Sequence, residues 1–419
     1  MRLVTTVLVC ALLACPAATG ARAANDGDVE RLIAQRLIPV MLGEDNTGGV
    51  AVAVRIGGRT LFYNYGFAEM TSRRPVTADS LFNLASLRKI FEAFVLALAV
   101  QRGELGFDDR VAQYVPELRQ GGYIRDVTLG QLASHTSGLL LPSDHPPWPT
   151  QRTALAGFIG ALNAWTPDAG QRPGRQHTYT HAGYVLLQLA LERRFGAPIG
   201  DLIGQRVLKP LGLNATVLPA GPLDSPQIPL ANAVQGYGER GEPIGIPGNQ
   251  QSYYDFPGTG QMFSSARDLA TLMAAHLGDI PVAPDLQAAM QFTRRGVVRI
   301  GPRITQALAW EVIDPQAGAA GGPTIVDKPG GINNASAYVG LVPDRKLGIV
   351  ILATACPTRS PAMSSCRRWR DSERKPPAAT RMVRRGEARA ARAAHALPAS
   401  STFASTSCII CSTILVFSA

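Results

Sequence analysis

Cysteine is missing from most of this sequence. All six cysteines lie before residue 16 or after residue 355, so the stretch from Ala24 to Ala355 contains none. A disulfide within that stretch is therefore excluded, as are a cysteine nucleophile and a zinc site built on thiolates. Any chemistry in this stretch must use other side chains.

A run of about 20 apolar residues, the length that a membrane-spanning helix needs, is also missing. The apolar run Leu3–Cys15 is shorter, follows the basic Arg2 and precedes Ala21-Arg22-Ala23, which has the small-x-small pattern of a cleavage site. These features predict a signal peptide over residues 1–23. A lipoprotein signal ending at Cys15 is the alternative, which the following Pro16 disfavours. We expect an exported, periplasmic protein without stable membrane insertion.

Excess charge is absent from the central stretch as well. The whole chain has 41 Lys and Arg against 31 Asp and Glu, a net charge of +10. Residues 356–419 hold 11 of the basic and three of the acidic side chains, and residues 1–23 hold two more basic ones. Acidic and basic side chains therefore balance over residues 24–355. Such a stretch lacks the basic surface that binds a phosphate backbone, so we expect no nucleic acid partner.

What is present indicates an α/β domain over residues 24–355. Hydrophobic residues make up 46% of the chain and charged residues 17%, which is enough for an ordinary core. Strand-like runs occur near both ends, and helical patterns broken by Pro and Gly lie between them. We expect a sheet region at about 24–85 and 225–355 and a helical region at about 86–224. The segments are an early helix at about Asp26–Leu42, a hairpin of Gly49–Ile56 and Thr60–Gly66 around Gly57-Gly58, and strands at Ala309–Ile313, Ala335–Val342 and Leu347–Ala353.

The last part of the chain follows a different pattern. Only nine of the 64 residues from 356 to 419 are Ile, Leu, Val or Phe, and Arg, Ala, Ser and Pro dominate without a period. Such a composition does not build a core. We predict an atypical basic tail, which is either a disordered extension or the product of a frameshift near codon 355.

The first chemical motif is Ser86-Leu87-Arg88-Lys89, an S-x-x-K at the start of the apolar helical run Ser86–Val100. A spacing of three places the lysine amine close to the serine hydroxyl on a helix. Serine is a poor nucleophile without a neighbouring base, and a desolvated lysine amine can be that base. The helix N-terminus also directs N–H groups to where an oxyanion would form. The alternative is that Ser86 only caps the helix.

A second motif, Tyr179-Thr180-His181, follows the turn Pro173-Gly174 and precedes the apolar run Tyr184–Leu189. A tyrosine at such a junction could shuttle protons, or it could cover a hydrophobic patch. A third motif, Lys328-Pro329-Gly330-Gly331, opens a strand pattern that runs to Val342. Its lysine could bind a substrate carboxylate, with glycine allowing close backbone approach, or it could be solvated. Proline donates no N–H, so we expect it at a sheet edge.

The remaining histidines and glycines indicate no cofactor. His177 and His181 are four residues apart but no carboxylate accompanies them, so we expect no metal. We interpret His135 as a structural histidine rather than a base. Gly258-Thr259-Gly260 lacks the strand–helix setting of a nucleotide-binding loop.

Taken in order, S-x-x-K, tyrosine and Lys-x-Gly make the chain resemble the serine β-lactamases and penicillin-binding proteins, specifically the class C (AmpC-type) β-lactamases. Further segments similar to class C chains cover about residues 26–355. They are Arg74–Thr77, Ser80–Ser86, Gly103–Leu105, Tyr114–Leu118, His135–Leu139, Leu208–Leu213, Leu308–Glu311, Tyr338–Pro343 and Leu347–Val350.

The resemblance implies a β-lactamase/transpeptidase-like fold, with an antiparallel sheet from both termini flanked by helices. It implies a secreted monomeric serine hydrolase without cofactor, which opens the β-lactam amide of penicillins and cephalosporins through an acyl-enzyme and so gives antibiotic resistance. Ser86 would be the nucleophile, Lys89 its base partner and Tyr179 the proton shuttle, also for the deacylating water. Lys328 would support Tyr179 and the substrate carboxylate. The backbone N–H groups of Ser86 and Gly331 would form the oxyanion hole.

Two residues depart from the class C pattern at the expected substrate-binding positions His181, Pro329 and Gly330. His181 stands where class C chains have asparagine, and Pro329 stands where they have threonine. Each lost polar contact is worth ~0.5–1.5 kcal/mol, or roughly tenfold in β-lactam affinity. An esterase or D-peptidase of the same fold, with weak or no β-lactam turnover, is therefore the alternative. A non-catalytic binding protein or an inactive frameshifted product is a third possibility, because the tail offers no segment like the family's C-terminal helix.

Overall fold

A computed structural model describes most of the chain between residues 26 and 354. The described residues are 26–42, 47–145, 149, 151–168, 171, 173–219, 231–238, 241–248, 260–314, 323–332 and 335–354. The predicted signal peptide (1–23) and the predicted tail (356–419) lie outside them. Over the described ranges, no helix combines the length and the apolar character needed to cross a membrane.

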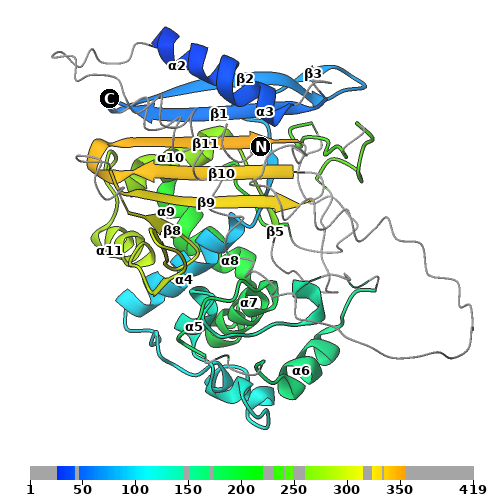
Figure 1. Cartoon of the computed structure of the whole chain (residues 1–419), viewed down its shortest axis with the longest axis vertical. Helices are drawn as coiled ribbons and strands as arrows, with labels where there is room; N and C mark the ends of the chain where they lie inside the picture. The colour runs from blue at the N-terminus through cyan, green and yellow to red at the C-terminus, as the bar shows by residue number, and fades with distance from the viewer. Residues whose placement is uncertain are drawn as a thin grey trace, which may run out of the picture.

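Nine antiparallel strands form the main sheet, in the order β3-β2-β1-β11-β10-β9-β8-β7-β6 (Figure 1). Strands from early and late in the chain are neighbours, because Val50 on β1 pairs with Ala353 on β11. The predicted sheet from both ends of the chain is confirmed. The strands are β1 (Gly49–Ile56), β2 (Arg59–Glu69), β3 (Arg74–Pro75), β6 (Val298–Arg299), β7 (Ile304–Gln306), β8 (Glu311–Ile313), β9 (Ile325–Ile332), β10 (Ala335–Val342) and β11 (Leu347–Ala353).

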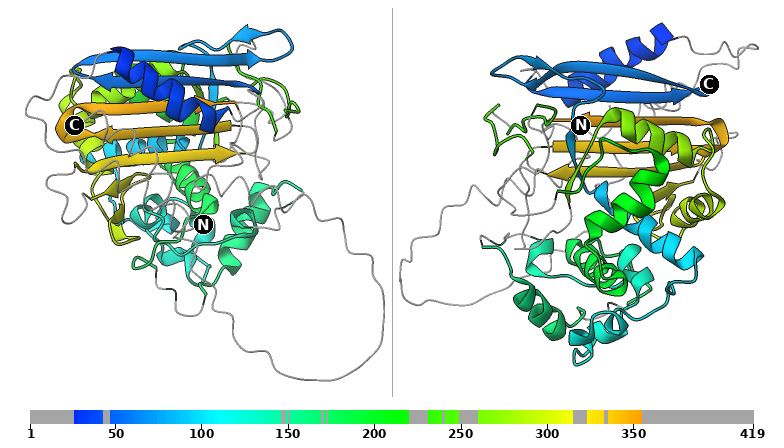
Figure 2. Two further views of the ribbon diagram at one scale, coloured as in Figure 1. Left: turned by 45° about the horizontal axis from the view of Figure 1, so that its top comes forward. Right: turned by 180° about the vertical axis from the view of Figure 1, so that it is seen from behind.

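Strand β1 shows how the sheet separates two apolar layers. Successive side chains of a strand point to opposite faces. Val52 therefore packs with Val29 and Ile33 under the N-terminal helical segment, while Ala53 lies in the cluster that contains Leu269 of α10. The N-terminal segment and α10 accordingly lie on opposite faces of the sheet (Figures 1 and 2). The segment consists of α2 (Asp26–Leu32), a π-helical turn (Ile33–Leu37) and α3 (Ile38–Met41), and α10 spans Ala266–His276.

A helical region lies below the sheet in the view of Figure 1. Its α-helices, together with α11 beside α4, are α4 (Arg88–Gln101), α5 (Leu129–Ala133), α6 (Leu155–Ala164), α7 (His181–Phe195), α8 (Ile199–Ile203), α9 (Lys209–Leu211) and α11 (Pro284–Thr293). A π-helical turn spans Gly204–Leu208, and short 3-10 turns span Val111–Gln113, Pro116–Leu118, Ile124–Asp126, Pro142–Asp144 and Pro343–Arg345.

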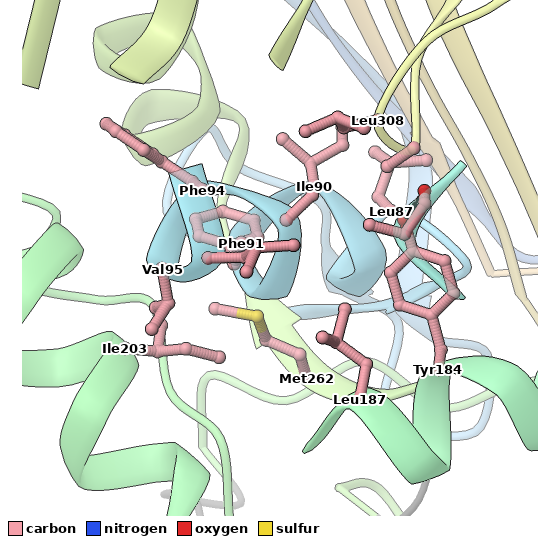
Figure 3. Close-up of a cluster of buried hydrophobic side chains, with 14 of the residues drawn as sticks. Leu87, Ile90, Phe91, Phe94, Val95, Tyr184, Leu187, Ile203, Met262 and Leu308 are labelled. Atoms are coloured by element: carbon pink, nitrogen blue, oxygen red, sulfur yellow. Dashed lines mark hydrogen bonds between the residues drawn. The ribbon is translucent and has the colours of Figure 1, made fainter. Parts of the chain in front are cut away.

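Helix α4 runs through the centre of the molecule. Every residue from Arg88 to Ala99 is buried, as expected for a helix that is apolar almost all round. Its Phe91 and Phe94 lie in a cluster with Leu187 and Met262 from other elements (Figure 3). Burial of each such side chain stabilises the fold by ~1.5–3 kcal/mol. The N-terminus of α4 is thereby held rigidly, which matters because Ser86 and Lys89 lie there.

The predicted start of a strand at Lys328 is wrong. Lys328-Pro329-Gly330-Gly331 lies in the second half of β9, and a hairpin then leads into β10. Strand β8 pairs with β9 only from Ile325 to Asp327. Pro329 lies beyond the end of that ladder, so its missing N–H removes no hydrogen bond to β8, and the strand continues through it.

Candidate active site

Ser86 lies in a tight turn between β4 (Phe82–Ala85) and α4. Strand β4 pairs with β5 (Gly260–Ser264) in a separate two-stranded sheet. Ala85 has a left-handed φ of 47°, and its N–H donates to the side-chain oxygen of Asn83 at 2.8 Å. Such backbone strain in a non-glycine residue often accompanies functional sites. The turn leaves Ser86 half-buried between buried neighbours, so its hydroxyl is accessible.

Four of the residues expected to be catalytic meet around this hydroxyl. The Ser86 Oγ lies 2.8 Å from the Tyr179 Oη, and Lys89 Nζ donates to the Ser86 Oγ at 3.4 Å. Above the Tyr179 ring, Lys328 Nζ lies 5.1 Å and Lys89 Nζ 5.3 Å from the ring centroid. The structure thus brings three distant chain segments together in one polar cluster.

Lys89 differs from an ordinary lysine because its amine is buried. Burial lowers the pKa of Lys89 from 10.5 to about 7, although the negative charge of Glu92 opposes the shift. About half of the amines are then neutral near pH 7. A neutral amine beside a hydroxyl can take up the hydroxyl proton, which is what a serine nucleophile requires.

Tyr179 is held in place by the N-terminus of α7. The Thr180 hydroxyl accepts from Gly183 N–H at 3.0 Å and donates to a carboxylate oxygen of Asp144 at 3.1 Å. The same carboxylate accepts from the N–H groups of His181 and Ala182, the latter at 3.1 Å. These bonds satisfy the free N–H groups of the first turn. They therefore fix the backbone two residues after Tyr179.

His135 supports the other side of Tyr179. Its ring centroid lies 4.3 Å from that of Tyr179 and 5.0 Å from that of Tyr184, and its Nδ1 accepts from Thr180 N–H at 3.3 Å. Complete burial lowers the pKa of His135 well below 6.5, so the ring stays neutral. It therefore lies against Tyr179 within the site, and its structural role stays a prediction.

The expected substrate-binding residues lie around the same cluster. His181 Nδ1 is 3.5 Å from Lys89 Nζ, and its ring stands at 89° to the ring of Tyr179. On β9, Pro329 is half-buried and Gly330 is buried. A Cβ on Gly330 would lie 2.8 Å from the Leu84 carbonyl and 3.1 Å from the Ser86 nitrogen, so only glycine fits here. This close approach brings Gly330, and the half-buried Gly331 after it, beside the Ser86 backbone.

Lys328 has a carboxyl group near it that sequence reasoning did not find. Its side chain is 3% exposed, and Glu311 on β8 is 6% exposed. Burial raises the pKa of the Glu311 carboxyl, and the positive charge of Lys328 opposes this shift. Glu311 was visible only as part of the segment Leu308–Glu311, which resembles class C chains. The pairing of β8 with β9 places it opposite Asp327, the residue before Lys328.

Asp144 is a second residue that sequence reasoning did not assign to the site. It lies in a Pro-rich stretch, and its partner His181 is 37 positions further along the chain. No local pattern could have indicated that contact. Among the described ranges, no cluster of three or more His, Cys, Asp or Glu side chains could hold a metal ion.

This chain is similar to known proteins over most of its length. The family model described as Beta-lactamase matches residues 29–365. A β-lactamase from Pseudomonas fluorescens is 28% identical over 357 residues, which cover 78% of this chain and 93% of that protein. A β-lactamase from Lysobacter lactamgenus is 28% identical over 360 residues, covering 79% of this chain and 87% of that protein.

Solved structures with the same fold give similar figures. A class C β-lactamase in complex with cefoxitin has a TM-score of 0.67 and 26% identity, with 83% of this chain and 99% of that chain covered. The D-alanine carboxypeptidase AmpC from Burkholderia cenocepacia has a TM-score of 0.68 and 26% identity, with 83% and 100% covered. The likeness extends over nearly the whole length of both structures.

Proposed function

Because this chain belongs to the beta-lactamase family, as a serine hydrolase similar to class C enzymes, we propose that it opens the β-lactam amide of penicillins and cephalosporins through an acyl-enzyme on Ser86. The observation that supports this most is the cluster at the N-terminus of α4. There the Ser86 Oγ lies 2.8 Å from Tyr179 Oη and 3.4 Å from Lys89 Nζ. Both neighbours can exchange a proton with the hydroxyl.

Acylation begins when the Ser86 Oγ attacks the lactam carbonyl carbon and its proton passes to the neutral Lys89 amine. The backbone N–H groups of Ser86 and Gly331 stabilise the resulting oxyanion. The C–N bond then breaks, and the leaving nitrogen takes a proton through Tyr179. Lys328, close to the Tyr179 ring, adds positive charge for the phenolate and for the substrate carboxylate.

Deacylation uses the same groups in reverse. Tyr179 takes a proton from a water molecule, and the hydroxide attacks the ester carbonyl of the acyl-enzyme. The bond to the Ser86 Oγ breaks, and the serine recovers its proton from the Lys89–Tyr179 pair. All atoms come from the substrate and one water molecule, so the scheme uses no cofactor.

The proposal includes the cellular location and the oligomeric state of the protein. We place a signal peptide at residues 1–23. The mature protein is then a monomer in the periplasm, the compartment in which β-lactams reach their targets. The features that support export are the basic Arg2, the short apolar run Leu3–Cys15 and the cleavage pattern Ala21-Arg22-Ala23.

A second candidate is an esterase or D-peptidase of the same fold, and His181 and Pro329 favour it. An imidazole replaces the amide that class C chains offer at position 181, and no hydroxyl is present at position 329. The match to a D-alanine carboxypeptidase, AmpC from Burkholderia cenocepacia, also favours it. Both candidates use Ser86, Lys89 and Tyr179 in the same roles.

Intact-mass spectrometry of the mature chain, residues 24–419, tests the proposal. After incubation with a penicillin we expect a mass increase of one penicillin, and no increase for Ser86→Ala. Nitrocefin hydrolysis should accompany the adduct. Hydrolysis of short p-nitrophenyl esters without nitrocefin hydrolysis would favour the second candidate, and full turnover by Ser86→Ala would reject both.

A further inference from the structure

Two buried charged residues next to the site have no part in the mechanism above. Arg88 and Glu92 lie on α4, on either side of Lys89 in the sequence, and both side chains are 0% exposed. The Arg88 Nε and the Glu92 Oε1 form an ion pair at 2.7 Å. Removing a buried ion pair from water is costly, so such a pair in an apolar helix needs a reason.

The pair also connects the two helices that carry the proposed catalytic groups. Arg88 Nη2 donates to the side-chain oxygen of Gln188 on α7 at 2.5 Å. Gln188 in turn donates to the Glu192 Oε1 at 3.1 Å, and Ile199 N–H at the start of α8 donates to the same oxygen at 2.9 Å. This chain of bonds joins α4, whose start holds Ser86 and Lys89, to α7, whose start holds Tyr179 and His181.

The same pair flanks Lys89 on α4: Arg88 lies one residue before it, Glu92 three residues after it, and all three are buried. The negative charge of Glu92 raises the pKa of Lys89, and the positive charge of Arg88 lowers it. Asp144 also raises it from the turn before α6. The other titratable side chains around this amine are His181, Tyr184, Tyr179 and His135. Lys328 lies near the Tyr179 ring as well.

We propose that Arg88 and Glu92 are positioning residues for the acyl transfer: their buried pair holds α4 against α7 and adjusts the charge state of Lys89. The inference rests on the proposed function, in which Lys89 must be neutral to accept the Ser86 proton. Glu92 raises the pKa of Lys89 and Arg88 lowers it, so removing each residue should shift the pH dependence of activity in opposite directions.

The experiment measures kcat/KM against pH for the full mature chain, with nitrocefin or a p-nitrophenyl ester as substrate. In the wild type, activity should fall below about pH 7 as Lys89 becomes protonated. Glu92→Gln removes a negative charge, so this acidic limb should move to lower pH by about one unit. Arg88→Met removes a positive charge, so the limb should move to higher pH by a similar amount.

Two further variants separate this role from general support of the fold. Arg88→Met/Glu92→Leu removes both charges of the ion pair together, so it should fold even where a single variant does not. Its acidic limb should stay near that of the wild type, and kcat should fall about tenfold at unchanged KM because the bond from Arg88 to Gln188 is lost. The control Arg55→Met removes the part-buried pair of Arg55 with Asp279, away from the site, and should leave limb and kcat unchanged.

Three results would decide against parts of this scheme. Single variants that lose activity equally at every pH, with fixed limbs, would overturn the effect on Lys89. A double variant with the kcat of the wild type would overturn the positioning role. A wild-type chain that turns over neither substrate class would reject the proposed function itself, and the inference with it.

Discussion

At the scale of single residues, His181 and Pro329 set this site apart from the class C pattern. The His181 Nδ1 lies 3.5 Å from the Lys89 amine, where a neutral imidazole can accept a hydrogen bond from an ammonium group. Burial and the charges of Lys89 and Lys328 lower the pKa of His181 well below 6.5, so its ring is neutral. Histidine at this position therefore contacts the Lys89 amine and offers no amide group.

Pro329→Thr tests the other departure. A threonine at this position of β9 adds a hydroxyl beside Lys328, where a β-lactam carboxylate would bind. We expect KM for a cephalosporin to fall by up to roughly tenfold, since a hydrogen bond to a charged group is worth ~1.5 kcal/mol or more. A neutral p-nitrophenyl ester has no carboxylate and serves as the control, with unchanged KM. An equal or higher KM for the cephalosporin would show that the hydroxyl is immaterial.

The sequence predicts some of these residue contacts and not others. A spacing of three on a helix places Lys89 near Ser86 from local geometry alone. That Tyr179 and Lys328 lie near Ser86 is implied only by the order of motifs in the family that the chain resembles. No local rule joins Ser86 to Tyr179, which is 93 positions away. The sequence shows Glu92 as an acidic residue in an apolar helix. Its part in joining α4 to α7 depends on Gln188 and Glu192 of α7, which no local pattern connects to it.

At the scale of elements, α7 depends on a residue outside it. Asp144 accepts hydrogen bonds from two N–H groups of its first turn and from the Thr180 hydroxyl. Burial raises the pKa of the Asp144 carboxyl in spite of these bonds. The start of α7 is therefore tied to the turn Pro142–Asp144, and Tyr179 with it.

Asp144→Ala should affect both stability and turnover. Loss of the capping bonds should lower the unfolding free energy by ~1–2 kcal/mol. It should also lower kcat, because the backbone that carries Tyr179 is no longer fixed. Urea unfolding and kcat for nitrocefin measure the two effects.

Ser265→Ala is the matched control for that variant. Ser265 caps α10 by accepting from Asp268 N–H at 3.1 Å, far along the chain from the residues of the site. We expect a similar loss of stability with unchanged kcat. Equal loss of kcat in both variants would mean that Asp144 acts on the fold alone.

The elements themselves were predicted with uneven success. Periodicity and the Gly57-Gly58 turn identified β1, β2, β10 and β11, since long alternating or apolar runs leave little ambiguity. Strand β9 was predicted to begin at Lys328 and to run on to Val342, whereas it begins at Ile325 and ends at Ile332, before β10. Only the pairing with β10, and the early end of β8, show why a strand can continue through Pro329 and the two glycines after it.

At the scale of the whole molecule, His276 makes the stability of the fold depend on pH. It is 5% exposed and packs against Phe94 and Trp310 from other parts of the core. Burial lowers the pKa of His276 to about 3, with a smaller contribution from Arg294. An unfolded chain titrates this histidine near 6.5, so between these values the unfolded state binds more protons.

The stability due to a neutral His276 is therefore complete above about pH 6.5 and is lost as the pH falls toward 3. The loss amounts to ~1.4 kcal/mol per pH unit over most of that range. His276→Leu removes this proton linkage. Urea unfolding should show that, as the pH falls from 6 to 4, the unfolding free energy of the variant rises relative to that of the wild type by about this amount per pH unit. A constant difference between the two proteins over this range would contradict the linkage.

The fold of the molecule as a whole followed from the resemblance, and the structure agrees with it. The nine-stranded antiparallel sheet and its covering helices match class C structures over most of the chain. The predicted tail at residues 356–419 lies outside the described residues. That this tail is a disordered extension or a frameshift product therefore stays a prediction.

The pairing of β1 with β11 has a consequence for how this protein can be made. Strand β11, which lies between β1 and β10, is among the last described parts of the chain to leave the ribosome. Until residues 347–353 arrive, two strands in the middle of the sheet keep open edges, and such contacts between distant segments form slowly. A nascent chain that stops before β11 keeps both of these edges open, and it is then a target for proteases and aggregation.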